Sequence, residues 1–368
     1  MNYKRIALRM LLPVIALPML FTMGCKEDNN DGNTAGNFDR KLLLENFADN
    51  IIIPYWGKMK TATDALSTAA DALIATPNTS TLQATQTAWT NAYTAWLYCN
   101  SFNYGPGEKP IFGMVNENIG TWPVSAGVVE NRIAAADFKF DDFRRDSRGL
   151  LTVEYLLFTP TALDSLTASS NRRQYLQKVI ADIKTWVDEN NTGWTTYRNA
   201  FVSNTDKSAG SPTSMLYNEF VKSFEAIKNF KIAVPGGKRA GQAQPEPHLC
   251  EAYYSGQSIK FIKEHFKAVE QMWRGIGANG TDGIGFDDYL DKVTGGAALK
   301  TETLKQLTAV NNVNKGFADS ELLAHLVLTE TGRIDTLHTE YQKMTRFFKS
   351  DLSSLLGIAI TYSSGDGD

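Results

Sequence analysis

A glutamate inside an apolar run is the residue whose surroundings point most directly to chemistry. Glu154 lies between Val153 and Tyr155 in the segment LLTVEYLLF, so we expect its carboxylate to be partly buried. A buried carboxylate must be ion-paired, hydrogen-bonded or protonated. Two interpretations follow: Glu154 is the central polar group of a ligand site, or it forms a structural ion pair with an arginine such as Arg148.

A histidine and a second glutamate lie close together in the second half of the chain. His248 and Glu251 have the spacing His-x-x-Glu, and these residue types are common metal ligands. The alternative for His248 is an exposed loop residue. Ser255 and Ser258 follow at the predicted start of a helix, where serines either cap the helix or donate hydrogen bonds to a ligand.

Three long stretches lack helical periodicity: Tyr104 to Pro123, Val234 to Pro247, and Gly275 to Gly285. Irregular segments of that length are unusual in a compact helical protein and suggest function. Trp122, in the first stretch, is predicted either to form a pocket wall or to anchor the loop by burying its ring. The glycine-rich third stretch lacks the Gly-Lys-Ser/Thr ending of a phosphate loop and is predicted to be a helix connection.

Apolar residues recur at helical spacing along most of the chain, and strand alternation is nearly absent. The predicted fold class is therefore all-α. Ser211-Pro212 is a strong helix start, and Pro54 should kink or offset the first helix. The predicted helices cover residues 39–73, 80–103, 143–158, 171–198, 212–231, 255–274, 300–316 and 319–329, with a further amphipathic stripe over 334–355.

The polar segment 203–211 separates the helices into two sets. This separation predicts two packed helical bundles of the four-helix type, residues 38–205 and 206–357, followed by a flexible tail over 358–368. A single elongated bundle is the alternative. The chain has 43% hydrophobic residues and 40 acidic against 37 basic side chains. The hydrophobic content is enough for conventional hydrophobic cores. The slight excess of acidic residues does not favour binding to nucleic acid.

The N-terminus has the features of an export signal. A basic region at Lys4 and Arg5 precedes an apolar stretch that ends at Thr22-Met23-Gly24-Cys25, which resembles a lipobox. We expect residues 1–24 to be a lipoprotein signal peptide, Cys25 to carry the acyl chains (palmitate and its relatives) that anchor the protein to a membrane, and residues 25–37 to form a flexible tether.

The residues after Cys25 bear on localisation. Lys26-Glu27-Asp28 resembles the signal that places Bacteroidetes lipoproteins on the outer face of the outer membrane, and a solvated linker is the alternative. The expected location is thus the outer membrane, either surface-exposed or on its periplasmic face. Cys99 and Cys250 remain, either as free buried thiols or as a disulfide.

Several segments resemble, in the same order, the imelysin family. The resemblance extends over about residues 38–356. The segments are Ile51 to Tyr55, Ala88 to Trp96, Thr121 to Pro123, Arg148 to Phe158 and Glu251 to Ser258.

The resemblance implies a pair of related helical bundles with a site between them. The family is classed with metallopeptidases, and relatives occur among iron-regulated lipoproteins and iron-uptake components. Its hallmark is Gly-x-His-x-x-Glu. Gly149 and Glu154 match this motif, but Leu151 occupies the histidine position. Leucine neither binds a metal nor acts as a base, so we expect binding rather than peptidase activity. His248 and Glu251 are the candidates for a shifted site for a divalent metal or iron.

The resulting prediction is an imelysin-like lipoprotein with a degenerate motif that binds a ligand between two bundles, in iron or haem uptake. Glu154 is expected at the centre of the site, with Arg148, Glu251, Ser255 and Ser258 around it. Two alternatives stay open. One is an active imelysin-type metallopeptidase with a peptide substrate, and the other is a surface adhesin or scaffold lipoprotein without a small-molecule site.

Overall fold

The structure is a computed structural model that describes residues 38–109, 111 and 113–362. These residues belong to one compact unit, residues 33–368. The predicted signal peptide, the lipidation site Cys25, the tether and the last part of the predicted tail lie outside the described residues. The fold is all-α apart from one two-stranded hairpin within the described part of the chain.

The first helices form a continuous run: α1 (Arg40–Asn46), the π-helix η1 (Phe47–Ile52) and α2 (Ile53–Ala75). Pro54 is at the start of α2, directly after the π-helical turns. Proline has no backbone N–H to donate to the preceding turn. The sequence predicted a kink or offset of the first helix at Pro54, and the structure has a change from π-helical to α-helical hydrogen bonding there.

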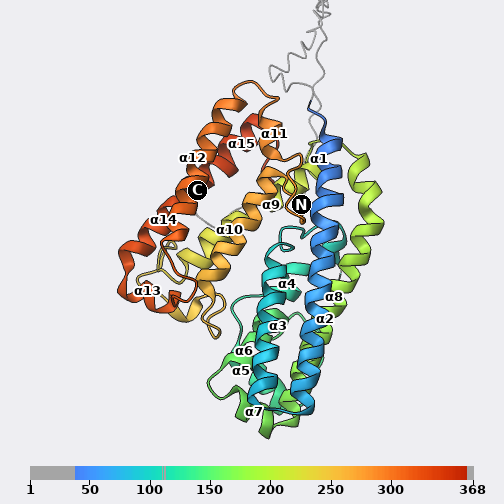
Figure 1. The fold of residues 1–368 in the computed structure, drawn as a ribbon, viewed down its shortest axis with the longest axis vertical. Helices are drawn as coiled ribbons and strands as arrows, with labels where there is room; N and C mark the ends of the chain where they lie inside the picture. The colour runs from blue at the N-terminus through green and yellow to red at the C-terminus, as the bar shows by residue number, and fades with distance from the viewer. Residues whose placement is uncertain (1–37, 110, 112, 363–368) are drawn as a thin grey trace, which may run out of the picture. The chain divides into compact units, whose positions relative to one another are not determined.

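Helix α2 packs along α3 (Thr79–Leu97) and along α8 (Ser170–Ser203), the longest helix described (Figure 1). α6 (Gly149–Phe158) contacts both α3 and α8. Short elements connect these helices: η2 (Gly105–Gly107), the antiparallel strands β1 (Glu108–Lys109) and β2 (Gly113–Met114), α4 (Val115–Ile119), α5 (Ala126–Ala134) and α7 (Ala162–Ala168).

The second half begins at the predicted Ser211-Pro212 start. The Ser211 side chain accepts a hydrogen bond from the Ser214 N–H, and Pro212 is the first residue of α9 (Pro212–Ala226). The remaining elements are the π-helix η3 (Ile227–Ala233), η4 (Pro247–Leu249), α10 (Ser258–Arg274), α11 (Phe286–Leu290), α12 (Gly296–Lys315), α13 (Leu323–Thr329), α14 (Thr331–Thr345), the π-helix η5 (Arg346–Asp351) and α15 (Leu352–Leu356).

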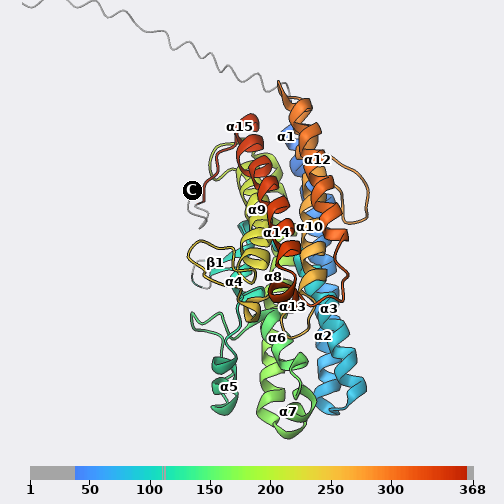
Figure 2. The same cartoon turned by 90° about the vertical axis from the view of Figure 1, so that its left-hand side faces the viewer.

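Helix α10 connects the two halves of the core. It contacts α9, η3 and α11 in the second half and α3 in the first. Figure 1 shows α10 between α12 and α14 on one side and the helices of the first half on the other, and Figure 2 shows α3 below it. The ring of Phe261 lies 5.9 Å from that of Trp89 and 4.6 Å from that of Tyr93. Aromatic side chains from before and after residue 205 therefore pack against one another. The division of the chain into two bundles at that residue stays a prediction.

Several boundaries differ from the sequence prediction. The expected helix over 143–158 begins only at Gly149, and the one over 255–274 begins at Ser258. The stretch 104–123 contains the hairpin and α4. Helices α5, α7 and α11 were not predicted, because five to nine residues span too few turns for periodicity to show.

The glycine-rich stretch Gly275 to Gly285 is held by the first helices. The side-chain amide of Asn46 donates to the carbonyl oxygens of Gly275 at 2.8 Å and Ile284 at 2.9 Å. The Ala278 N–H donates to the carbonyl of Asn50 at 2.7 Å. These contacts give the stretch a structural role as a connection between helices.

The start of the predicted tail is also held in place. Ile358 is buried, and Asn218 on α9 exchanges hydrogen bonds with the carbonyl of Ala359 and the N–H of Thr361. Cys99 and Cys250 are buried and free. Over the residues that the structure describes, none of the helices has the combination of length and apolar character needed to cross a bilayer.

Gly149, the motif glycine, is required for a close contact. Its φ is +78°, and a Cβ at this position would lie 2.5 Å from the carbonyl oxygen of Ile119. That distance is far inside van der Waals contact, and the neighbour is backbone rather than a flexible side chain. Gly149 thus lets α6 pack directly against the end of α4.

Replacing Gly149 with alanine should destabilise the fold through this contact. Gly210 is a matched control, because its φ is +84° but a Cβ there would meet nothing within 4 Å. Gly210→Ala should cost only backbone strain, about 1–2 kcal/mol. Gly149→Ala should cost about 1–3 kcal/mol more, measured as the free energy of unfolding in urea. Equal losses in the two variants would contradict the contact.

Candidate functional site

Glu154 on α6 is almost fully buried, with 2% of its surface exposed. Its carboxylate accepts a hydrogen bond from the backbone N–H of Ser255 at 2.7 Å. Burial raises the pKa of Glu154 to about 7, while hydrogen bonds from Ser255 and Tyr254 act in the opposite direction. Glu154 therefore meets polar groups of the second half of the chain: the main chain of Tyr254 and Ser255 and the side chain of Ser255, in the turn before α10.

Arg148 does not pair with Glu154. Its Nε and Nη2 donate to the two carboxylate oxygens of Asp182 on α8, at 3.0 and 2.5 Å. Its guanidinium also lies over the ring of Phe140, 5.3 Å from the centroid. Arg148 and Asp182 line a shallow hollow of about 410 Å³ on this side of α8.

Ser255 and Ser258 both donate hydroxyl hydrogen bonds within their own turn, and the Ser255 side chain also interacts with Glu154. Ser255 Oγ donates to the carbonyl of Ala252 at 3.2 Å, and Ser258 Oγ donates to the carbonyl of Glu251 at 2.5 Å. Both side chains thus stabilise the backbone between Glu251 and α10. Together with Glu154 they determine the conformation from which Glu251 extends.

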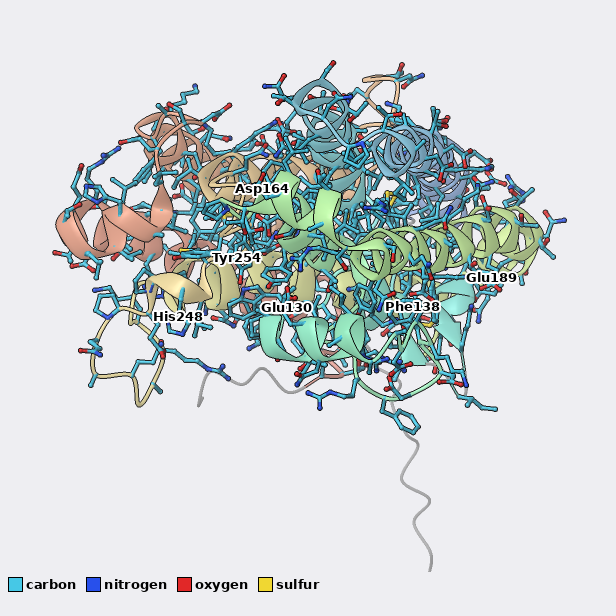
Figure 3. The ribbon with its side chains drawn as sticks, turned by 90° about the horizontal axis from the view of Figure 1, so that it is seen from below. Glu130, Phe138, Asp164, Glu189, His248 and Tyr254 are labelled. Atoms are coloured by element: carbon cyan, nitrogen blue, oxygen red, sulfur yellow. The ribbon has the colours of Figure 1, made fainter. Side chains whose placement is uncertain are left out.

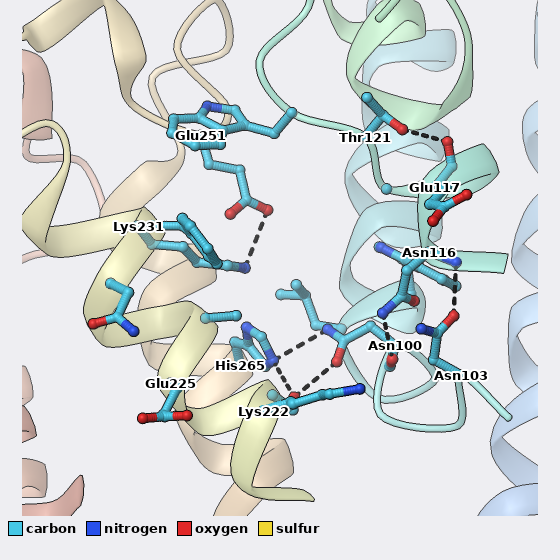
Figure 4. A pocket seen from close by; sticks show the side chains of 18 of the residues that line it. Asn100, Asn103, Asn116, Glu117, Thr121, Lys222, Glu225, Lys231, Glu251 and His265 are labelled. Carbon is cyan, nitrogen blue, oxygen red and sulfur yellow. Dashed lines mark hydrogen bonds and ion pairs between the residues drawn. The ribbon is translucent and has the colours of Figure 1, made fainter. Parts of the chain in front are cut away.

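A cavity of about 640 Å³ lies next to this turn (Figure 4). Of the predicted candidates, Trp122 and Glu251 line it, whereas Arg148, Glu154, Ser255, Ser258 and His248 do not. Most of the remaining lining residues have polar side chains. They are Asn100, Asn103, Asn116, Glu117, Thr121, Arg145, Glu219, Lys222, Ser223, Glu225, Asn229, Lys231 and His265.

Two structural features bring these residues to the cavity. The residues of η3 form one wall, where α9 changes from α-helical to π-helical hydrogen bonding, a change often found at functional sites. The segment from Asn116 to Trp122 forms the opposite wall and follows from the packing of α4 against Gly149. The rings of Trp122 and Phe230 are 6.3 Å apart, so the two walls meet through aromatic contact.

Lys231 and Glu251 form the principal buried pair at the cavity. The Nζ of Lys231 is 3.1 Å from Oε1 of Glu251, and their side chains are 7% and 14% exposed. The hydroxyl of Tyr93 donates to the same carboxylate oxygen. Burial raises the pKa of Glu251 to about 8 and lowers the pKa of Lys231 to about 7, so burial favours the neutral form of both groups.

His265 on α10 lies below this pair. Its Nε2 is 2.7 Å from Ser223 Oγ and 3.1 Å from Asn100 Nδ2. Its Nδ1 is buried without a hydrogen-bond partner among the described residues. Burial, and then the charge of Lys231, lower the pKa of His265 well below its usual range. The imidazole is therefore neutral and can accept a hydrogen bond but binds protons poorly.

Two further ion pairs lie at the cavity. Lys222 contacts Glu219 at 2.5 Å, and its side chain is 41% exposed. Glu225 accepts hydrogen bonds from Lys349 at 3.1 Å and from the Tyr362 hydroxyl at 2.6 Å. The side chains of Lys349 and Glu225 are 16% and 5% exposed, so this pair is about as buried as that of Lys231 and Glu251.

No group of three or more His, Cys, Asp or Glu side chains is arranged to hold a metal ion in the part of the chain that the structure describes. His248 is exposed on η4 (Figure 3), and Glu251 contacts Lys231 and Tyr93. The proposed role of His248 and Glu251 as metal ligands stays an untested prediction.

Sequence reasoning missed Lys231 and His265. Helical spacing contained the signal, because His265 lies on the same face as Ile262 and Phe266, which are both buried. A histidine on the apolar face of a helix must find polar partners inside the protein. Lys231, between the apolar residues Phe230 and Ile232, gave a weaker indication of burial.

The protein is thus of the all-helical class, with a cavity lined by residues of α3, η3 and α10. The family model described as Imelysin matches residues 52–339. The chain belongs to the imelysin family. No curated protein shows significant sequence similarity to it.

Two solved structures share the fold. One is a Parabacteroides distasonis protein described as an iron-regulated protein A precursor, with a TM-score of 0.70 and 16% sequence identity over 86% of this chain and 95% of that chain. The other is an imelysin-like protein from Psychrobacter arcticum, with a TM-score of 0.69 and 18% identity over 89% of this chain and 99% of that chain. At these identities the likeness is one of fold.

Replacing Glu154 with glutamine should change how stability depends on pH. Because the folded pKa of about 7 exceeds the usual glutamate value of 4.5, the folded protein binds more protons between these values, and the free energy of unfolding falls as pH rises through that window. Glu154→Gln cannot titrate, so its loss of stability from pH 5 to pH 8 should be smaller by roughly 2–3 kcal/mol.

Urea denaturation at pH 5 and pH 8 measures this difference. Glu302→Gln, at an exposed position of α12, is the matched control and should follow the wild type. A Glu154→Gln protein with the same pH dependence as the control would show that this carboxyl titrates normally.

Proposed function

We propose that this chain is a ligand-binding protein of the imelysin family that takes part in iron or haem uptake and acts by binding rather than by proteolysis. The observation that carries the proposal is the cavity lined by Lys231, Glu251 and His265. Lys231 and His265 are buried at its wall, Glu251 is largely buried there, and each is held by at least one polar partner.

The cavity has the properties of a small-molecule site. Its volume of about 640 Å³ falls in the usual range for such sites, which combine apolar walls with a few fixed polar groups. Trp96, Trp122 and Phe230 supply apolar surface. The polar groups are positioned before a ligand arrives, and this reduces the entropy lost on binding.

The residues support binding better than metal-dependent hydrolysis. A zinc peptidase uses three protein ligands, a bound water and a general base. Leu151 replaces the motif histidine, and Glu154 is occupied by backbone N–H groups. The link to iron comes from the family and from the name of the Parabacteroides distasonis relative.

Calorimetric titration with haemin and with ferric citrate tests the proposal. The wild type should bind at least one of them saturably. Lys231→Met and Glu251→Gln should each weaken that binding at least tenfold, about 1.4 kcal/mol, because each removes a polar group fixed at the wall. Lys305→Met, at an exposed position of α12, is the control and should bind as the wild type does.

Other outcomes identify the alternatives. Chelator-sensitive peptide hydrolysis that is lost in Glu154→Gln would indicate an active metallopeptidase. Binding of neither probe, with no hydrolysis, would favour an adhesin or scaffold.

We also propose that Cys25 is acylated and anchors the protein in the outer membrane. The proposal rests on the basic and apolar residues before Cys25 and on the lipobox-like sequence. In cells fed labelled palmitate, the wild type should incorporate label and partition into detergent, whereas Cys25→Ala should do neither. Protease digestion of intact cells should then distinguish the outer face from the periplasmic face. Equal labelling of both proteins would refute the anchor.

A further inference from the structure

Lys231, Glu251 and Tyr93 form a cluster that the binding proposal does not fully use. The Lys231 amine is at the wall of the cavity and 3.1 Å from a carboxyl oxygen of Glu251. Figure 4 shows the two side chains directed toward one another from η3 and from the turn before α10. The Tyr93 hydroxyl bonds to the same oxygen from behind.

The second lysine of the lining provides a contrast. Lys222 is 41% exposed and paired with Glu219, whereas the Lys231 side chain is 7% exposed. A hydrated ammonium has no lone pair and cannot attack a carbon atom. A buried amine is more easily kept neutral, because burial disfavours the charged form, and such lysines act as nucleophiles toward carbonyl compounds.

We propose that Lys231 captures an aldehyde or keto compound in this cavity as an imine, with Glu251 as the proton donor and acceptor. This inference rests on the proposed function, since it requires that the cavity receive a ligand. It adds a further class of ligand, small carbonyl compounds, and a covalent step.

The step balances without an oxidant or reductant. The Nζ lone pair of Lys231 forms a bond to the carbonyl carbon, and the carbonyl oxygen takes a proton from the Glu251 carboxyl group. The nitrogen returns one proton to the Glu251 carboxylate, which gives the neutral carbinolamine. The Glu251 carboxyl group then protonates the hydroxyl group, which leaves as water while the C=N bond forms, and Glu251 takes the second proton from nitrogen. Both amine protons thus end in the water, and Glu251 is again protonated.

The geometry favours this role over a purely structural ion pair. A structural pair needs only its two members, yet here Tyr93 holds the Glu251 carboxyl group from the protein side. Glu251 would therefore stay in position after the Lys231 nitrogen had bonded to a ligand. The pair also faces a cavity rather than packed side chains, so a small molecule can reach the nitrogen.

The rest of the lining suits a small polar carbonyl compound. Across the cavity from Lys231, Asn100, Asn116 and Thr121 extend from the opposite wall (Figure 4). Their amide and hydroxyl groups can exchange hydrogen bonds with hydroxyl or carboxylate groups of a ligand. The imidazole of His265 is neutral and adds no charge beside the amine.

Reductive trapping in the full chain tests the inference. The protein is incubated with pyruvate or with glycolaldehyde and then with cyanoborohydride, which reduces an imine to a stable secondary amine. Peptide mapping by mass spectrometry then locates the adduct. We expect saturable labelling at Lys231, at least tenfold above that of any exposed lysine, from one or both compounds.

Variants separate the roles of the residues. Lys231→Met should lose the principal adduct, and Lys305→Met, which changes an exposed lysine of α12, should keep it. Glu251→Gln should slow adduct formation at least tenfold while Lys231 remains the labelled residue. If Lys231→Met fails to fold, the position of the adduct in the wild type decides by itself.

Two results would overturn the inference: no adduct above a control without carbonyl compound, or labelling spread evenly over exposed lysines. Calorimetric titration without reductant distinguishes this failure from that of the proposed function. Reversible binding of haemin or ferric citrate that depends on Lys231, with no trapped adduct, would retain the binding site and reject the imine.

Discussion

The hydrogen bond between the Glu154 carboxylate and the Ser255 N–H is the contact on which the site depends. It ties α6 in the first half of the chain to the turn that carries Glu251 in the second. An ionised carboxylate would be costly at 2% exposure. Main-chain N–H groups reduce that cost, and burial still raises the pKa of Glu154 to about 7. The turn is thereby held where Glu251 reaches the cavity.

The residues of the degenerate motif thus hold in place the segments that line the cavity. Gly149 allows α4 to approach α6 and so places the wall from Asn116 to Trp122. Leu151 is buried in the core, and Glu154 holds the turn before α10. In this chain the chemistry lies next to the motif, in the side chains of Lys231, Glu251 and His265.

The cavity groups share one physical property, which is burial with few charged neighbours. Desolvation raises the pKa of Glu251 and lowers those of Lys231 and His265. All three changes favour uncharged groups near neutral pH. A site of this kind binds through directed hydrogen bonds and has an amine available for reaction, in contrast to the charged rim formed by Lys222 and Glu219.

The amino-acid sequence alone determined the all-α fold, the long helices, the Ser211-Pro212 helix start and membership of the imelysin family, because helical periodicity and caps are local and the family segments are read in order. It also indicated that Glu154 is buried. Only the tertiary structure decided what Glu154 contacts and that Tyr93, Lys231, Glu251 and His265 meet at one cavity. The physical reason is that residues such as Tyr93 and Glu251, 158 positions apart, come together through packing between helices, which no local pattern encodes.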